Sequence, residues 1–349
     1  MTDWPDGLEQ WVTPEGWKKI LAVDAHAEGE PLRVIVDGFP HDGFPRDARG
    51  GVRAWRRAAR ERHDELRRAL LWEPRGHADM YGCVVGPPVS PDADVSVLVI
   101  HNAGFSTMCG HGVIAVTTVL LETGLASRVS GEGVDPGQGE GDDERSLGID
   151  TPAGLVVAHA AMEGKRVAGV RFRNVPSFVL RLDAEVDVPA VGPVRYDLAY
   201  GGAFYAYVSA EALGVELSPA EVPRLIEVGR SIKATVQRAD PPSHPDSDDL
   251  GFLYGTIFVG EGRVPGSHSR NVCVFADGEV DRSPTGTGVS GRLALHHARG
   301  ELEEGQRIVV ESVLGTRFSG RIVGRSRVGP HDAVVPEVGG RAWITGVNR

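Results

Sequence analysis

The segment Met108-Cys109-Gly110-His111-Gly112 and a near-copy of it, Pro284-Thr285-Gly286-Thr287-Gly288, lie about half the chain length apart. Each is followed by a valine, by a run of residues typical of a helix and then by a glycine, Gly124 or Gly300, at the same offset. Such a repeat indicates one fold built twice, with two helix N-termini that face each other across a cleft. One copy carries a thiol and the other a hydroxyl at the matching position, and this asymmetry bears on the chemistry.

Length and strand pattern fit two lobes of mixed structure. A chain of 349 residues suits two domains of ~150 residues each. Short β-rich runs dominate, and the two helices that stand out, Val113–Leu121 and Val289–Ala298, follow the glycine motifs. We therefore predict an α/β (α+β) fold of two pseudo-symmetric lobes, each a curled mixed β-sheet around a central helix. We place the first lobe at residues 1–197, with strand 338–349 as a candidate to complete it, and the second lobe at 198–337.

Charge and hydropathy restrict the partners. A net charge of −11 argues against nucleic acid, which favours proteins with a basic face. Residues 46–75 are a local exception with ten arginines. We interpret them as a solvated helix face interleaved with Glu61, Asp64 and Glu65, in preference to an anion-binding patch. No apolar run resembles a transmembrane helix, so no membrane partner is predicted.

The cysteines and the N-terminal residues indicate a cytoplasmic protein. Cys83, Cys109 and Cys273 are widely spaced and include no CxxC pair, so neither a disulfide framework nor a zinc site is indicated. Residues 1–20 carry four acidic side chains where a signal peptide needs a basic and then an apolar stretch. We predict a reducing compartment and no metal.

The two glycine motifs predict a site for a small anion. Consecutive glycines at a helix start leave backbone N–H groups exposed, and the positive end of the helix favours negative charge there. Neither motif has the lysine of a phosphate-binding loop. A small carboxylate held by the N–H groups of Gly110, His111, Gly286 and Thr287 is the simpler interpretation. A single glycine turn of this kind is more often structural, but here it occurs twice.

Cys109 is the candidate catalytic residue. A thiol at a helix N-terminus is expected to have its thiolate favoured by the helix dipole and by nearby N–H donors. It could act as a nucleophile or as a base, whereas we take Cys83 and Cys273 as small core residues. His111, two residues further on, is expected to offer its backbone N–H to the ligand and to support Cys109 electrostatically.

Asp281 stands four residues before Thr285. A carboxylate there could bind an ammonium group while the glycine motifs bind a carboxylate, which together would make an amino-acid or imino-acid site. The alternative is that Asp281 is a turn or cap residue beside Pro284.

At this level of detail the chain resembles the proline racemase superfamily over nearly its whole length. The segments that carry the resemblance are His26 with Glu28-Gly29-Glu30-Pro31-Leu32-Arg33-Val34, Glu73-Pro74-Arg75-Gly76-His77-Ala78-Asp79-Met80-Tyr81-Gly82, Met108-Cys109-Gly110-His111-Gly112, Asp150-Thr151-Pro152-Ala153-Gly154-Leu155, Tyr200-Gly201-Gly202-Ala203-Phe204-Tyr205 and Asp281-Arg282-Ser283-Pro284-Thr285-Gly286-Thr287-Gly288. The resemblance implies two halves like those of diaminopimelate epimerase, an active site between them, no metal or organic cofactor, and a homodimer.

The resemblance also implies the reaction. Racemases and epimerases of the family have a second cysteine where Thr285 stands, because they need a thiol on each face of the α-carbon. A threonine hydroxyl has no accessible anion at neutral pH, so the Cys109/Thr285 pairing resembles the eliminating branch of the family. That branch removes water from trans-3-hydroxy-L-proline to give Δ1-pyrroline-2-carboxylate.

Stereochemistry favours elimination independently. In trans-3-hydroxy-L-proline the α-hydrogen lies on the same ring face as the hydroxyl, so one thiol can remove the proton and return it to the departing hydroxyl. The alternatives are 4-hydroxyproline 2-epimerase or proline racemase activity, a cysteine-dependent hydrolase, and a binding protein for imino acids without catalysis.

Overall fold

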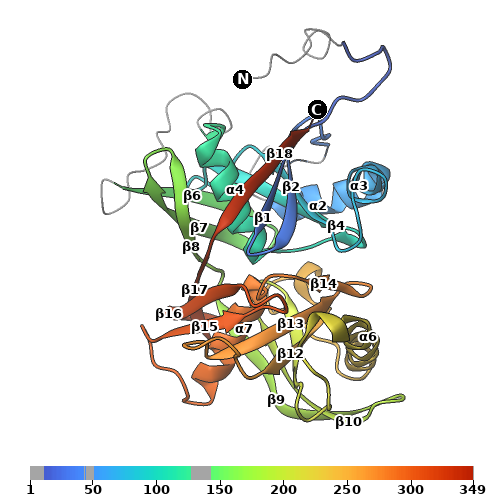
Figure 1. Ribbon diagram of the computed structural model, residues 1–349, viewed down its shortest axis with the longest axis vertical. Coiled ribbons are helices and arrows are strands. Elements are labelled where there is room, and N and C mark those ends of the chain that lie inside the picture. Colours follow the sequence, from blue (N-terminus) through green and yellow to red (C-terminus); the bar gives the residue numbers. More distant parts are fainter. Residues whose placement is uncertain (1–11, 43, 45–50, 127–142, 349) are drawn as a thin grey trace.

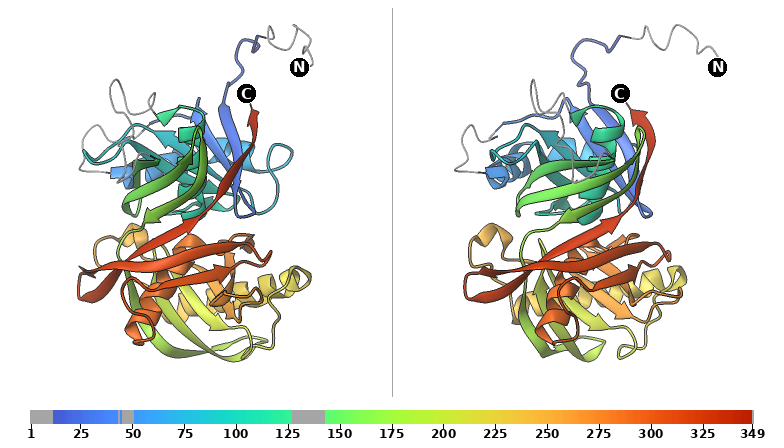
Figure 2. Two further views of the ribbon diagram at one scale, coloured as in Figure 1. Left: turned by 60° about the vertical axis from the view of Figure 1, so that its left-hand side comes forward. Right: turned by 90° about the vertical axis from the view of Figure 1, so that its left-hand side faces the viewer.

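The computed structural model describes residues 12–42, 44, 51–126 and 143–348. They form two lobes stacked along the long axis of the molecule (Figure 1). The described strands hydrogen-bond into one continuous set of eighteen, which curls around a separate helix in each lobe. Figure 2 shows the two curled sheets from the side. This is the predicted architecture.

The first lobe surrounds helix α4. Its strands and helices are β1 (Leu21–Ala27), β2 (Glu30–Asp37), α2 (Gly51–Arg62), α3 (Asp64–Leu71), β3 (Tyr81–Gly86), β4 (Val95–His101), β5 (Gly104–Phe105), α4 (Gly110–Glu122), β6 (Glu144–Thr151), β7 (Gly154–Glu163), β8 (Arg166–Arg173) and β18 (Ala342–Asn348).

The second lobe surrounds helix α7. Its elements are β9 (Ser177–Val188), β10 (Gly192–Tyr200), β11 (Phe204–Ser209), the 3-10 turn Pro219–Glu221, α6 (Val222–Ala239), the 3-10 turn Asp248–Leu250, β12 (Leu253–Gly260), β13 (Ser269–Phe275), β14 (Glu279–Asp281), α7 (Gly286–Ala298), β15 (Arg307–Glu311), β16 (Arg317–Val328) and β17 (His331–Gly340).

Strand pairing makes the two lobes near-copies of each other. The first runs β18-β1-β2-β3-β4-β6-β7-β8, with parallel pairs at β2–β3 and β4–β6. The second runs β9-β10-β11-β12-β13-β15-β16-β17, with parallel pairs at the matching places, β11–β12 and β13–β15. β17 also pairs with β8, so the two sheets are joined along one edge.

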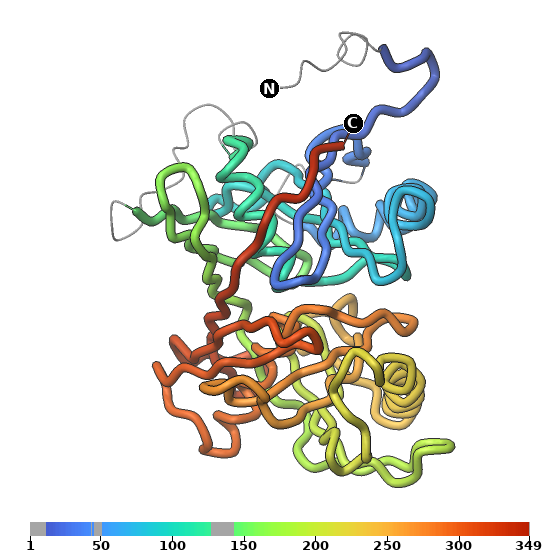
Figure 3. Tube along the Cα trace, viewed as in Figure 1, coloured from blue at the N-terminus to red at the C-terminus, as the bar shows by residue number. Residues whose placement is uncertain are grey.

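The division between the lobes follows from these hydrogen bonds. β9 pairs with β10 and with β17, and β10 runs through residue 197 to pair with β11. We therefore propose that the second lobe starts with β9, earlier in the chain than the expected boundary at 197/198. β18 pairs with β1, and Figure 3 shows the C-terminal segment rising from the second lobe to lie along the first.

The central helices are buried on all sides because their sequences lack a polar face. Every residue of α4 from Gly110 to Leu120 is buried, as is every residue of α7 from Gly286 to Leu295. Full burial of one such aliphatic side chain contributes about 1.5–3 kcal/mol. Both helix N-termini therefore have fixed positions inside the molecule.

Two expectations about helices were wrong. The arginine-rich stretch forms α2 and α3 where it is described, with residues 45–50 outside the described part, but it is not a wholly solvated face. Arg56 and Arg67 are buried; Arg56 donates to the carbonyl of Phe105, and Arg67 to that of His101 at 2.7 Å. Helix α6 was not predicted, although its buried residues Leu225, Gly229, Ile232 and Val236 follow helical spacing. None of the described helices is long and apolar enough to cross a membrane.

Candidate active site

The N-termini of α4 and α7 meet at two glycines. A Cβ atom on Gly110 would lie 2.6 Å from the Cα of Gly286, and one on Gly286 would lie 2.8 Å from the Cα of Gly110. No side chain fits between the helices at this point. The predicted approach of the two helix starts therefore occurs, and it needs glycine at both positions.

Cys109 caps helix α4 with its own sulfur. Its backbone is extended, and the N–H of Gly112 donates to Sγ at 3.2 Å. Both ring nitrogens of His111 approach the same sulfur, Nδ1 at 3.3 Å and Nε2 at 3.4 Å. A Cβ on Gly112 would lie 2.9 Å from the sulfur, so this glycine leaves room for the thiol.

Thr285 holds the matching position on α7 in a different conformation. Its φ of 65° and ψ of 92° lie in the left-handed half of the Ramachandran plot, which β-branched residues rarely adopt. Such strained residues concentrate at functional sites. The buried Thr285 hydroxyl has no hydrogen-bond partner of good geometry in the described structure, although it lies near Cys273 and Asp281. Burial raises the pKa of both groups, and the Thr285 hydroxyl offsets part of that rise.

Asp281 lies beside His111, across the junction of the lobes. Its Oδ2 is 3.8 Å from Nδ1 of His111, and its Oδ1 accepts a hydrogen bond from the N–H of Ser283 at 2.7 Å. Burial raises the pKa of Asp281 to about 6 and lowers that of His111 to about 3. The imidazole is therefore neutral at pH 7, and the contact is no ion pair.

Burial disfavours the thiolate of Cys109 in this closed site. Burial raises its pKa well above the ordinary value and the nearby carboxyl of Asp281 raises it further, whereas the N–H of Gly112 lowers it. The N–H of Gly112 at the helix N-terminus favours the thiolate, as expected, but in the closed site the loss of water outweighs this donor.

Two contacts between the lobes hold the Asp281 segment against the first lobe. The backbone N–H of Arg282 donates to Oε2 of Glu30 at 2.7 Å, and that of Val280 donates to Oδ1 of Asp79 at 3.0 Å. Glu30 is fully buried, and burial together with the charge of Asp281 raises its pKa well above the ordinary value. The first lobe thus positions the carboxyl that faces His111.

The cavity between the helix starts has walls that the sequence did not reveal. All the predicted site residues line it: Cys109, Gly110, His111, Asp281, Thr285, Gly286 and Thr287. The residues that were missed are Tyr81, Met108, Tyr205, Tyr254, Cys273 and Phe275. Cys273 is buried, as expected of a core residue, but it also faces this cavity, directly across the β13–β14 pair from Asp281. Every residue of β13 is buried, so no alternation along the strand marks the side that faces the cavity.

The cavity is narrow. Its volume is about 10 Å³, room for about one water molecule. The hydroxyls of Tyr81 and Tyr254 touch across the lobes, and the hydroxyl of Tyr205 lies 2.7 Å from Oγ1 of Thr287. In the described part of the chain, no group of three or more His, Cys, Asp or Glu side chains is arranged to hold a metal ion.

The two lobes have the same strand topology, and their central helices adjoin at N-termini that carry a thiol and a hydroxyl. This arrangement defines the class of protein. The family model described as proline racemase matches residues 22–349. The chain belongs to the proline racemase family, and the predicted fold class is confirmed.

Relatives within the family carry two different names. A protein of Colwellia psychrerythraea called trans-3-hydroxy-L-proline dehydratase is 42% identical over 97% of this chain and 92% of its own length. A protein of Burkholderia multivorans called 3-hydroxyproline 2-epimerase is 43% identical over 94% of this chain and 93% of its own. The crystal structure of a hydroxyproline epimerase from Agrobacterium vitis, with bound trans-4-hydroxy-L-proline, matches with a TM-score of 0.84 and 32% identity, covering 95% and 92% of the two chains.

Proposed function

We propose that this chain is a trans-3-hydroxy-L-proline dehydratase, a hydro-lyase that needs no cofactor. The observation that carries the proposal is the pairing of one thiol, Cys109, with one hydroxyl, Thr285, at two helix starts that abut through glycine. Elimination on one ring face needs a single thiol, whereas two-base racemisation needs one on each face. The name of the Colwellia psychrerythraea relative supports the same reaction.

Backbone N–H groups hold the substrate carboxylate in this proposal. The donors are those of Gly110, His111, Gly286 and Thr287, at the positive ends of α4 and α7. Removal of the α-proton places further negative charge on that carboxylate, as an enediolate. Fixed donors then bind the transition state more strongly than the substrate.

Asp281 binds the protonated ring nitrogen. Its carboxyl is buried and has a neutral imidazole beside it, so a substrate ammonium supplies the missing positive charge. The positive charge of the substrate ammonium also lies near Cys109. It lowers the pKa of the thiol and so offsets the rise that burial causes. The thiolate is thus favoured when substrate is present.

The chemical step then needs only Cys109. Its thiolate takes the α-proton, the electron pair of that C–H bond forms the ring double bond, and the 3-hydroxyl leaves with the proton that the thiol returns. The products are water and Δ2-pyrroline-2-carboxylate, which tautomerises to Δ1-pyrroline-2-carboxylate. The hydroxyl of Thr285 stays neutral throughout.

Substrate entry requires the lobes to open. A cavity of about 10 Å³ is too small for a hydroxylated proline ring, and the Tyr81–Tyr254 contact spans the two lobes. Separation of the lobes breaks that contact and exposes the helix starts. Closure then excludes water from the reacting atoms.

Epimerisation at the α-carbon is the second candidate function. The Burkholderia multivorans relative is called an epimerase, and the thiol of Cys273 stands on the Thr285 side of the cavity. Its pKa is raised well above the ordinary value by burial and by Asp281, which disfavours a second thiolate.

Incubation in heavy water separates the two functions. The enzyme is given trans-3-hydroxy-L-proline, trans-4-hydroxy-L-proline, L-proline and D-proline in turn, and water loss, α-hydrogen exchange and chirality are followed. We expect loss of water from the 3-hydroxy compound alone. Exchange and inversion without water loss would establish an epimerase and refute the proposal.

The proposal extends to the oligomeric state and the cellular compartment. The family resemblance supports a homodimer, and the cysteine pattern supports the cytoplasm. Sedimentation of the purified chain measures the first, and fractionation of cells that express it measures the second.

A further inference from the structure

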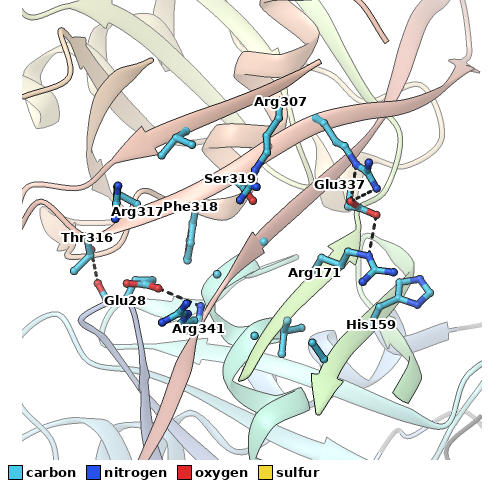
Figure 4. A pocket seen from close by; sticks show the side chains of 18 of the residues that line it. Glu28, His159, Arg171, Arg307, Thr316, Arg317, Phe318, Ser319, Glu337 and Arg341 are labelled. Carbon is cyan, nitrogen blue, oxygen red and sulfur yellow. Dashed lines mark hydrogen bonds and ion pairs between the residues drawn. The ribbon is translucent and has the colours of Figure 1, made fainter. Parts of the chain in front are cut away.

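A second, larger cavity lies away from the helix starts, on the outer side of the joined sheets. Figure 4 shows it from close by. Its volume is about 1000 Å³, and its walls come from β7 and β8 of the first lobe and from β15, β16 and β17 of the second. It shares no lining residue with the cavity at Cys109. We call it the arginine groove.

The groove follows from the register of the strands. Ser319 on β16 pairs with Gly339 on β17, Gly339 pairs with Arg171 on β8, and Arg171 pairs with His159 on β7. Opposite residues share one face of the sheet, so this row runs across both lobes. Gly339 has no side chain, and this leaves the middle of the row open. A Cβ there would lie 3.1 Å from Oγ of Ser319 and 3.6 Å from Cβ of Arg171.

Five arginines and two glutamates line the groove. Glu337 is buried and fixes two of the arginines. Its carboxylate lies 2.7 Å from Nη2 of Arg321. It also lies 3.5 Å from Nε of Arg171 (Figure 4). These two guanidinium groups are therefore held in place on the β16–β17–β8 side of the groove.

The other three arginines make no close ion pair. In the part of the chain that the structure describes, the side chains of Arg307, Arg317 and Arg341 make no ion pair within 4.0 Å. Glu28 lies among them; its carboxylate accepts a backbone hydrogen bond from Arg341 at 3.2 Å and interacts electrostatically with Arg341 and Arg317. Five arginines against two glutamates still leave three excess positive charges in the groove, in contrast with the net charge of −11 on the whole chain.

We propose that the arginine groove binds a small anion with two or more phosphate or carboxylate groups. Planar guanidinium groups bind such oxyanions with paired hydrogen bonds, and a concave site strengthens the field of its charges. Arg307 and Arg317 belong to the second lobe, whereas Arg341 immediately precedes β18 of the first. One bound anion therefore contacts both lobes and links their relative position to its own binding. The substrate, with one carboxylate and a cationic nitrogen, is a poor match for this site.

Calorimetric titration of the full chain tests the proposal with two probes, pyrophosphate and citrate, in chloride buffer. We expect saturable binding of at least one probe at one site per chain, weakening as salt is raised. The probe that binds more tightly assigns the ligand to phosphates or to carboxylates. The triple variant Arg307→Gln/Arg317→Gln/Arg341→Gln is expected to lower that affinity at least about tenfold.

The control is Arg325→Gln/Arg327→Gln, which removes two exposed arginines of β16, the strand of Arg317, that do not line the groove. It should bind the probe as the wild type does. Equal weakening in both variants, or no saturable binding of either probe to the wild type, overturns the proposal. If the triple variant is misfolded by circular dichroism, the single variant Arg317→Gln takes its place, and unchanged affinity there refutes the site.

Discussion

Cys109 and Thr285 occupy equivalent positions on α4 and α7 but cap them in opposite ways. Cys109 has φ of −145° and turns its sulfur back to accept the N–H of Gly112, whereas Thr285 has φ of 65° and makes no side-chain cap. The first N–H groups of α7 thus have no competing acceptor in their own cap residue. We infer that α7 supplies the stronger half of the carboxylate site.

Replacement of Cys109 by serine tests the base. Cys109→Ser should lower turnover of trans-3-hydroxy-L-proline at least about a thousandfold, because a serine hydroxyl is far harder to ionise than a thiol. The matched control is Cys273→Ser, a second buried thiol in the same cavity. It should keep most of the activity. The measurement is steady-state kinetics on variants whose circular dichroism spectra match that of the wild type. Near-normal turnover by Cys109→Ser would refute the mechanism.

Asp281 predicts how activity depends on pH. Its pKa of about 6 means that kcat/KM should rise as pH increases through about 6, when the carboxylate that holds the ammonium forms. Asp281→Asn should lose most of kcat/KM and also lose this step in the pH profile. An unchanged pH profile of kcat/KM in the variant would show that Asp281 is only a turn residue.

The same group predicts an opposite trend for stability. Because the folded pKa is raised from 3.8 to about 6, ionisation of Asp281 destabilises the fold, by up to about 3 kcal/mol above pH 6. Stability that is present below pH 3.8 is thus lost as pH rises through about 6. Asp281→Asn should unfold at a temperature no lower than wild type at pH 8. Thermal melts at pH 4 and pH 8 measure this, and a large drop at pH 8 would contradict it.

Thr285→Cys tests the missing second thiol. The substitution puts a thiol across the cavity from Cys109 and should introduce weak racemisation of proline, since both faces of the α-carbon then have a base. Chiral analysis after long incubation is the measurement. Efficient racemisation by the wild type would overturn the proposed function, whereas an inactive variant would question only the geometry at Thr285.

Gly110→Ala tests the contact between the helix starts. The added methyl would lie 2.6 Å from the Cα of Gly286 and must push α4 and α7 apart. Overpacking of this kind costs about 1–3 kcal/mol, and displaced N–H donors should lower kcat/KM about a hundredfold. Gly104→Ala is the control, because a Cβ on Gly104 meets nothing within 4 Å. Equal kinetic losses in the two variants would refute the role of the contact.

Much of the site could be predicted because it lies on two short, locally encoded motifs. A glycine-rich turn before an apolar run predicts a helix start from sequence alone, and this located Cys109, Thr285 and their N–H donors. Asp281 was close enough along the chain to be included. These features depend on neighbours in sequence, which a sequence displays directly.

The walls of the cavity depend on long-range pairing. Tyr81 and Tyr254 come from different lobes, and no local pattern shows that their hydroxyls meet. Equally, the ten arginines of 46–75 look like a solvated face, but the burial of Arg56 and Arg67 depends on carbonyls of the β4–β5 region. The left-handed backbone at Thr285 was not predictable because threonine disfavours it.

The pairing of β18 with β1 has a consequence for how the protein is made. Ala22 pairs with Asn348, so one edge of β1 stays unpaired on the ribosome until β18 has been made. The second lobe, from β9 to β17, is contiguous and closes its own sheet through the pairing of β9 with β17, a strand that precedes β18 in the chain. The half that is translated first is therefore the half whose sheet is completed last, and in the interval its open edge is a site where two nascent chains could pair with each other.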